Sequence, residues 1–277
     1  MTPASSGSAR PPVGVDPTRP SIARVYDAGL GGKDNYEVDR AVLAELKEVF
    51  PQVVEFAWTG RNFLIRVARF LAQQTDITQF IDCGSGLPTA ENTHQVVQRM
   101  DPDARVVYID NDPVVLAHGR ALLEDNDQTF LADADLFQPR QVLEHPIVQR
   151  HLDLSEPVAL LQISTLHHHV GERHEPAQIM KEYVDALPSG SFVAIGHFCD
   201  PENEYTEKAR DFERVLSEGD LGSGTFRTMS EIEELFPGLE MMPPGVVPVV
   251  DWWPEGPKLK QPDETHFLFA GGVGRKP

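Results

Sequence analysis

The stretch FIDCGSGLPT, residues 80–89, decides the fold of this 277-residue chain. An apolar run ends in Asp82, and Gly84 and Gly86 follow at a spacing of two, before Pro88. Glycine lets the backbone turn tightly and approach a ligand closely, and proline is well tolerated in the first turn of a helix. The pattern therefore predicts a strand, a ligand-binding turn and a helix, in that order.

A second apolar run, RVVYID at residues 105–110, also ends in an acid, Asp110. The interval between Gly86 and Asp110 is about what a helix and a second strand require. An acid at the carboxyl end of that strand can accept hydrogen bonds from both hydroxyls of a ribose. The two runs together predict a nucleoside-binding α/β fold.

These residues favour S-adenosylmethionine over a dinucleotide as the ligand. The dinucleotide fingerprint requires a third glycine at position 89, where this chain has Thr89. Asp82 would also place a negative charge beside a pyrophosphate, whereas it suits a ligand with an amino acid end and a sulfonium cation. An NAD-dependent oxidoreductase of the same fold stays the alternative.

The composition limits the classes of partner. The chain has 43 acidic residues against 24 Lys and Arg, a formal net charge of −19. A broad nucleic-acid surface needs clustered Lys and Arg, so no nucleic-acid partner is expected. The two cysteines, Cys83 and Cys199, cannot build a disulfide framework or a cysteine-based zinc site. No apolar run approaches the ~20 residues that cross a bilayer, and the N-terminus lacks the apolar core of a signal peptide. We expect a cytoplasmic protein without a membrane partner.

The pattern of residues along the chain divides it into three regions. Residues 1–20 are rich in Pro, Ser, Gly and Thr and are expected to form a disordered tail. Residues 21–75 carry apolar residues at spacings of three and four, which is typical of helices, with glycines at a bend near Gly31. In residues 76–277 strand-like and helical segments alternate, which predicts a mainly parallel sheet with helices on both faces.

The individual elements can be placed from periodicity and from Gly and Pro. We expect strands over 79–83, 105–110, 128–133, 157–164 and 191–196, with a closing pair at 245–251 and 266–272. We expect helices ending at Met100, beginning at Asp112, and over 139–149, 175–186, 204–218 and 229–236. Ligands bind outside the carboxyl ends of such strands, at Gly84–Gly86, Asp110-Asn111, Asp133–Asp135, Ser164–His167 and Gly196–Phe198.

Several longer motifs accompany these elements: ARVYD (23–27), LGGKDNY (30–36), GLPT (86–89), YIDNDPV (108–114) and PGVVP (244–248). With them the chain resembles an actinobacterial family of S-adenosylmethionine-dependent methyltransferases, formerly a domain of unknown function. The resemblance covers about residues 21–277. It implies the Rossmann-like class I methyltransferase fold with a seven-stranded sheet, and S-adenosyl-L-methionine as cofactor. It does not name a substrate.

The resemblance also implies roles for particular residues. Residues 21–75 would form a helical lid, in which Lys33 meets the cofactor carboxylate and Tyr26 or Tyr36 stacks on a flat ring. An acid after the third strand, either Asp133 or Asp135, would contact adenine. The expected cofactor-binding set is Tyr26, Lys33, Asn35, Asp82, Gly84, Ser85, Gly86, Asp110, Asn111, Asp133, Asp135 and Ser164. The chain departs from the family at Gly60 (usually Asn), at His168 and His169 (usually apolar), and at Trp253 (commonly Arg).

The string LHHH, residues 166–169, carries the most reactive side chains. If the strand continued, His167 and His169 would share one side. His167 is the candidate catalytic residue, because neutral imidazole can remove a proton near pH 7. It could instead only line the acceptor pocket. A metal held by His167, His169 and His197 is the less favoured reading, and we expect none.

The expected function is methyl transfer from S-adenosylmethionine to an unidentified, small-molecule acceptor. Two other classes stay open at this level. One is the NAD-dependent oxidoreductase, and the other is a catalytically silent S-adenosylmethionine-binding regulatory protein. The sequence leaves the oligomeric state undecided, with a homodimer among the choices.

Overall fold

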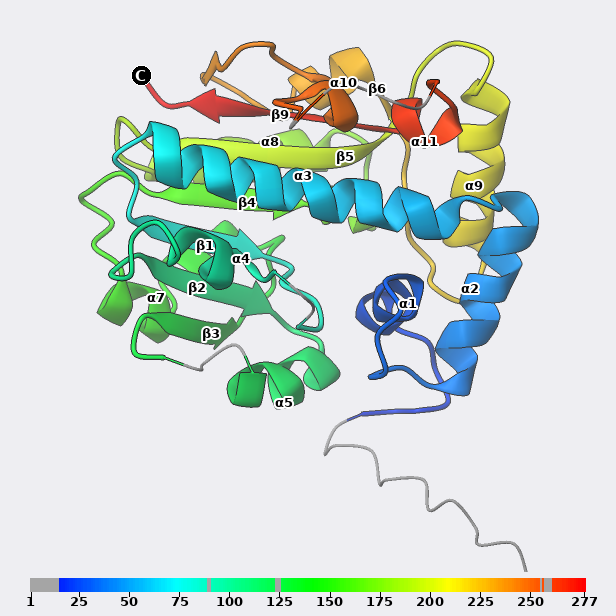
Figure 1. Cartoon of the computed structure of the whole chain (residues 1–277), viewed down its shortest axis with the longest axis horizontal. Helices are drawn as coiled ribbons and strands as arrows, with labels where there is room; N and C mark the ends of the chain where they lie inside the picture. The colour runs from blue at the N-terminus through cyan, green and yellow to red at the C-terminus, as the bar shows by residue number, and fades with distance from the viewer. Residues whose placement is uncertain (1–14, 89–90, 123–125, 255, 257–260) are drawn as a thin grey trace, which may run out of the picture.

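The chain folds around a mixed β-sheet that carries helices on both faces (Figure 1). The computed structural model describes residues 15–88, 91–122, 126–254, 256 and 261–277. Five strands run parallel: β1 (Gln79–Cys83), β2 (Arg105–Asp110), β3 (Thr129–Asp133), β4 (Ala159–Ile163) and β5 (Phe192–Asp200). Each connection between consecutive strands contains at least one helix, as parallel pairing requires.

The strand order is β3-β2-β1-β4-β5-β9-β7. At the far side, β9 (Phe269–Arg275) runs antiparallel to β5, and β7 (Glu240–Met241) runs antiparallel to β9. Two further two-residue strands extend the sheet, β6 (Arg227–Thr228) beside β5 and β8 (Val247–Pro248) beside β9. The predicted mostly parallel sheet is confirmed; β8 lies within the predicted strand 245–251, whereas β6 and β7 were not predicted.

The order of strands reverses between β1 and β4. The chain first builds outward from β1 to β3, and β4 then returns to the other side of β1. At such a switch point the connections leave toward opposite faces, so the carboxyl ends of the two strands open a crevice. The fold therefore places its ligand crevice beside the turn that follows β1.

Successive strand residues alternate between two apolar cores. Phe80 and Val106 belong to the first core, whereas Ile81 and Val107 belong to the second. The first core is covered by α2 (Glu37–Val49), α3 (Val53–Gln74), α4 (Thr93–Val97) and α9 (Thr206–Glu218). The second is covered by α6 (Pro139–Leu143), α7 (Pro146–His151), α8 (Glu175–Ala186) and α10 (Met229–Glu233).

The N-terminal helices lie beyond the carboxyl ends of the strands. α1 (Ile22–Gly29) sits past the arrowheads of β1 and β2, and α2 turns back toward α9 (Figure 1). Gly31, at φ +82°, makes the predicted bend between them. Of the predicted tail, residues 1–14 lie outside the described residues, and Val15 packs on the apolar cluster around Leu87 that includes α5 (Pro113–Leu122).

Several predicted elements differ from those observed. Residues 266–267 are not strand but the end of α11 (Glu264–Phe267), because the Asp263 side chain accepts a hydrogen bond from Thr265 N and caps a helix there. Only β8 and a 3₁₀ turn occupy 245–251. The helix expected over 139–149 is two helices, because Pro146 begins a new one. α4 is only five residues long.

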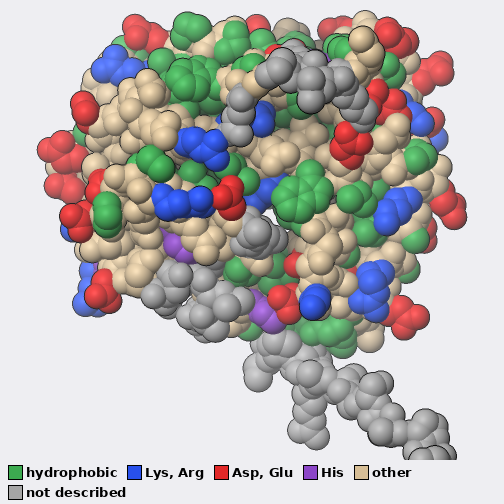
Figure 2. All heavy atoms as spheres, in the orientation of Figure 1, with side chains coloured by type: hydrophobic (Ala, Val, Ile, Leu, Met, Phe, Trp, Pro, Cys, Tyr) green, Lys and Arg blue, Asp and Glu red, His purple; other side chains and the backbone are tan. Residues whose placement is uncertain are grey.

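The surface agrees with the acidic composition. Acidic side chains are spread around the face in Figure 2, and Lys and Arg are scattered rather than gathered in one patch. Among the described residues, no helix is both long enough and apolar enough to span a membrane.

A buried ion pair joins α1 to α2. Asp39 is fully buried and accepts hydrogen bonds from Arg24 Nε at 2.9 Å, Tyr36 N at 2.7 Å and Ser21 N at 3.1 Å. Substitution Asp39→Ala should lower the free energy of unfolding by about 3–5 kcal/mol, because it leaves the Arg24 guanidinium buried without its countercharge. Urea denaturation measures this change.

The matched control is Asp185→Ala, which removes the exposed pair between Lys181 and Asp185. That substitution should change stability little, because exposed ion pairs are solvated and screened. Equal losses in the two variants would show that the Arg24–Asp39 pair does not hold the N-terminal helices together.

Candidate functional site

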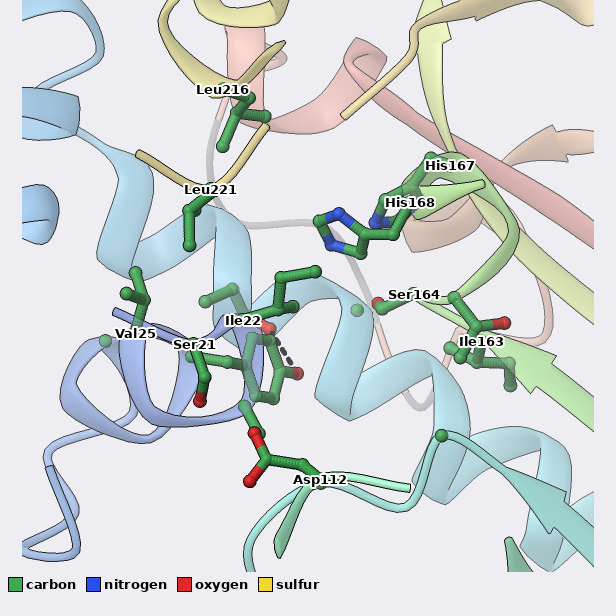
Figure 3. A pocket seen from close by; sticks show the side chains of 18 of the residues that line it. Ser21, Ile22, Val25, Asp112, Ile163, Ser164, His167, His168, Leu216 and Leu221 are labelled. Atoms are coloured by element: carbon green, nitrogen blue, oxygen red, sulfur yellow. Dashed lines mark hydrogen bonds between the residues drawn. The ribbon is translucent and has the colours of Figure 1, made fainter. Parts of the chain in front are cut away.

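A cavity of about 600 Å³ occupies the crevice at the switch point. Its walls are the turn after β1, the start of α5, the residues after β4, and the inward faces of α1, α2, α3 and α9. Its volume falls in the range of pockets that bind small molecules and cofactors. Figure 3 shows α1 closing one side, where Ser21, Ile22 and Val25 belong to the lining.

The glycine turn forms the floor of one end of the cavity. Gly84 and Gly86 adopt φ values of +68° and +62°, which other residues rarely adopt. A Cβ on Gly84 would lie 2.4 Å from the Thr165 methyl group, so that position also lacks space for a side chain. The N–H groups of Gly84 and Ser85 donate to the Ile109 carbonyl, at 2.7 and 3.2 Å.

Asp110 links this turn to the next one. One carboxylate oxygen accepts from Gly86 N and the other from Asp112 N, both at 2.9 Å. A carboxylate oxygen has two lone pairs, so both oxygens can accept a further bond from a ligand. Burial raises the pKa of Asp110 to about 6, although these hydrogen bonds oppose the shift.

A second buried carboxyl and a guanidinium lie beside the turn. Asp82 accepts the Thr93 hydroxyl at 2.6 Å, and burial raises its pKa to about 6. Arg61 of α3 donates to Glu91 O at 3.0 Å and to Asn92 Oδ1 at 3.1 Å. Among the described residues lining the cavity, Arg61 is the only Lys or Arg. This end of the cavity can therefore meet a ligand that carries both signs of charge.

Nine of the residues proposed from sequence line the cavity, and four do not. The nine are Tyr26, Asp82, Gly84, Ser85, Gly86, Asp110, Asn111, Ser164 and His167. The structure does not bring Lys33, Asn35, Asp133 or Asp135 to it.

The four outlying residues have other surroundings. Lys33 is exposed, and Asn35 Nδ2 donates to Asp27 Oδ2 at 2.8 Å inside the turn between α1 and α2. Asp133 is exposed on a separate shallow hollow beside α6. Asp135 accepts from Phe137 N at 2.9 Å and so begins the turn after β3. Leu136 and Phe137 line the cavity there instead.

The histidines after β4 do not alternate between two sides, as they would if the strand continued. β4 ends at Ile163, Ser164 takes φ +63°, and Leu166–His168 form a 3₁₀ turn. The His167 ring stacks on Phe198 at a centroid distance of 3.5 Å, and burial holds its pKa well below the ordinary value, so the ring is neutral. His168, which was not among the proposed site residues, points into the cavity (Figure 3).

The metal alternative finds no support in these positions. His169 Nε2 lies 3.6 Å from Glu175 Oε2, away from the cavity lining. Within the described ranges, no three His, Cys, Asp or Glu side chains are grouped so that they could hold a metal ion.

Arg61 and Gly60 also line the cavity, although they were not among the site residues predicted from the sequence. Both lie in the middle of α3, where the apolar spacing identifies a helix but not which polar residue meets a ligand. A Cβ on Gly60 would come within 2.9 Å of Ser164 Oγ, so glycine makes room for Ser164 at the cavity wall. His168 and Gly60 had one sequence signal, since both depart from the residues usual in the resembling family.

The sequence profile of the S-adenosyl methyltransferase family matches residues 8–277. The chain belongs to this family. Comparison with curated proteins gave no match. The assignment makes the protein an S-adenosylmethionine-dependent methyltransferase, as the resemblance implied. It gives no support to the oxidoreductase alternative.

Two solved structures resemble the methyltransferase closely. A predicted methyltransferase from Thermobifida fusca YX is 41% identical, with a TM-score of 0.90 over 97% of this chain and 99% of that chain. A DUF574 family protein from Streptomyces avermitilis MA-4680 is 32% identical, with a TM-score of 0.87 over 95% and 99% of the two chains.

The polar end of the cavity fits the cofactor of this methyltransferase. A Cβ at Gly86 would meet no protein atom within 4 Å, so the glycine turn leaves open space there, and Asp110 keeps lone pairs for ribose hydroxyls. Asp82 and Arg61 offer opposite charges to the ammonium and carboxylate groups of the methionine end. S-adenosylmethionine is the cofactor.

The raised carboxyl pKa values make cofactor binding depend on pH. Burial raises the pKa of Asp82 and of Asp110 to about 6, and a ligand that donates hydrogen bonds or carries a cation requires them ionised. The affinity for S-adenosylhomocysteine should fall on the order of tenfold per required carboxylate between pH 7 and pH 5. Calorimetry across this range measures it, and Asp110→Asn should flatten part of the profile.

The stability of the unliganded protein should follow the opposite trend. Both groups hold a proton more tightly when folded than when unfolded, so their contribution to stability is present at low pH and lost as the pH rises through about 6.

For the binding experiment, an affinity for S-adenosylhomocysteine that does not change between pH 5 and pH 7 would show that neither carboxylate meets the cofactor.

Proposed function

We propose that the protein transfers the methyl group of S-adenosylmethionine to a small molecule held in the same cavity. The observation that carries this proposal is the continuation of the cavity beyond the glycine turn, into a second end bordered by α1, α2 and α9. A concave site of this size favours a small acceptor over a protein or nucleic-acid chain. The scattered basic residues on the acidic surface agree with that choice.

The cofactor-binding residues would each contact a different part of the ligand. Asp110 accepts hydrogen bonds from the ribose hydroxyls, and the turn at Gly84–Gly86 lets the backbone approach the ligand closely. Asp82 faces the ammonium group, and Arg61 takes the carboxylate in the role first given to Lys33. An ion pair inside a cavity is stronger than one at the surface, because little water screens it.

Positioning is the main catalytic task of the chain. The cofactor supplies a methyl group on a sulfonium, and displacement requires the acceptor atom, the methyl carbon and the sulfur to lie in line. The residues between the two ends of the cavity, Ser164 and His167 among them, would fix that geometry. α1 would exclude water from it.

We further propose that the moving part of the predicted lid is α1 with the turn to α2. Ile22, Val25 and Tyr26 of α1 line the cavity, and the Tyr26 hydroxyl donates to the Ala57 carbonyl at 3.2 Å. By contrast, α3 buries Phe63 and Leu71 in the first core, which ties it to the sheet. The segment that opens would therefore be shorter than residues 21–75.

Arg61 can be tested with two ligands that differ at the methionine end. Arg61→Met should weaken binding of S-adenosylhomocysteine at least tenfold, because the ligand carboxylate loses its charged partner. Binding of 5′-methylthioadenosine, which has no carboxylate, should change little. Calorimetry with both ligands gives the comparison, and Lys33→Ala is the matched control.

Three results would count against these proposals. Equal losses for both ligands would mean that Arg61 only supports the loop at Glu91 and Asn92. A loss with Lys33→Ala alone would return the carboxylate to Lys33. Tight binding of NAD without binding of S-adenosylhomocysteine would overturn the proposed function itself.

The lid can be tested by hydrogen exchange. Saturation with S-adenosylhomocysteine should slow amide exchange in α1 and the following turn, because ligand binding favours the closed position. α8 packs on the other face of the sheet and provides the internal control, since its exchange should not change. Equal protection of α1 with and without ligand would make it a fixed structural cap.

A further inference from the structure

We propose that the apolar end of the cavity binds an uncharged, largely hydrophobic acceptor with one hydroxyl group, and that His168 accepts the proton of that hydroxyl. This inference rests on the proposed function and adds the chemical class of the acceptor. It is carried by three observations: the apolar lining, the placement of the charged residues, and the orientation of one histidine.

The end of the cavity away from β1 and β2 is lined by hydrophobic side chains from several elements. Figure 3 shows Val25, Leu216 and Leu221 on this side, across from Asp112. The lining here includes Val25, Leu43, Leu46, Phe198, Leu216 and Leu221. An acceptor with a hydrophobic body, flat or aliphatic, would bury its surface against these groups.

The charged residues of the cavity lie at the other end. In the described part of the chain, the charged side chains of the lining are Arg61, Asp82, Asp110 and Asp112. They come from α3, from the end of β1 and from the end of β2 with the residues after it. An ionic acceptor would therefore lose its hydration at the apolar end without meeting an opposite charge, which disfavours carboxylates and ammonium groups alike.

His168 is a polar group that reaches into this end. Its ring projects from the 3₁₀ turn into the cavity, opposite Leu221 (Figure 3). His168 Nδ1 lies 3.1 Å from the Oγ of buried Ser223, so Nε2 is the ring nitrogen left for a ligand. Two backbone hydrogen bonds hold the segment around Ser223, from Ser223 N to Leu216 O and from Thr225 N to His167 O.

The protonation state agrees with a hydroxyl ligand. Burial lowers the pKa of His168 to about 4, so the ring is neutral at pH 7. A hydrogen bond to Ser223 opposes this lowering. In the tautomer whose Nδ1 donates to Ser223 Oγ, 3.1 Å away, the lone pair lies on Nε2 and can accept a hydrogen bond from a hydroxyl.

The transfer step then balances without another reactant. The acceptor oxygen forms a bond to the methyl carbon, and the carbon–sulfur bond breaks with its electron pair going to sulfur. The hydroxyl proton passes to His168 Nε2, so one positive charge leaves the sulfonium and one appears on the imidazole. Low basicity suits His168 to a phenol-like hydroxyl rather than to an aliphatic alcohol, because such a proton is more easily given up.

A set of naphthalene derivatives tests the class of acceptor. The protein is first saturated with S-adenosylhomocysteine, and calorimetry then measures binding of 1-naphthol, 1-naphthoate and 1-naphthylmethylammonium. We expect 1-naphthol to bind at least tenfold more tightly than either ion. Equal or tighter binding of one of the ions, or displacement of S-adenosylhomocysteine by 1-naphthol, would overturn the assignment of an uncharged acceptor to this end.

Variants test the role of His168. His168→Phe keeps a flat ring at this position. It should weaken the binding of 1-naphthol about three- to tenfold and leave the binding of naphthalene unchanged, because only the hydroxyl loses a partner. Ser223→Ala should give a smaller loss of the same kind. His169→Asn is the matched control, since His169 does not line the cavity. Equal losses for naphthol and naphthalene would show that His168 only fills space.

Methyl transfer gives the second measurement. With methyl-labelled S-adenosylmethionine, the wild-type protein should form the methyl ether of 1-naphthol, and His168→Phe should slow this on the order of 10²–10⁴-fold. An unchanged rate, or a bound naphthol that is never methylated, would overturn the proton-acceptor role. If S-adenosylhomocysteine itself fails to bind, the proposed function fails; if it binds and naphthol does not, only this inference fails.

Discussion

The carboxylate of Asp110 is the group on which the cofactor end of the site depends. Its two oxygens accept backbone hydrogen bonds from Gly86 and Asp112, so one side chain fixes the turn after β1 against the start of α5. These N–H groups lie at the crevice where the strand order reverses. Without the carboxylate they would lose their partners in a partly buried place, at a cost on the order of 1–3 kcal/mol.

Burial of the two carboxyl groups also makes their negative charge costly unless a cation lies nearby. Asp82 and Asp110 have pKa values raised to about 6, because burial penalises the charged form. Under the proposed assignment, a ligand that carries a sulfonium and an ammonium group relieves this penalty, and Arg61 of the cavity lining meets its carboxylate.

The cavity combines two chemical environments because two layers of the molecule meet there. The polar end comes from strand ends, where backbone groups and acids gather at the edge of the sheet. The apolar end comes from helices that turn their buried faces inward, with α1 anchored to α2 by the Arg24–Asp39 pair. A methyl donor with several charges would bind at the polar end, and an uncharged acceptor would bind at the apolar end.

Much of the fold follows from local sequence rules. Apolar runs bounded by turn residues predicted the five parallel strands to within a few residues, and Gly84 and Gly86 were identifiable because their turn requires φ angles open mainly to glycine. Asp110 followed from its place at a strand end. These features depend on neighbours in sequence, so the sequence by itself determined them, and with them the fold class and the cofactor.

Only the tertiary structure decided which polar side chains meet the cavity. Arg61 lies on a long helix whose pattern does not reveal which face meets a ligand, while Lys33 lies on a turn directed to solvent. His168 faces the cavity because the chain leaves the strand at Ser164 and enters a 3₁₀ turn, which replaces the alternation of a strand by three residues per turn. Such choices depend on contacts between distant segments, as between His168 and Ser223, and no local pattern encodes them.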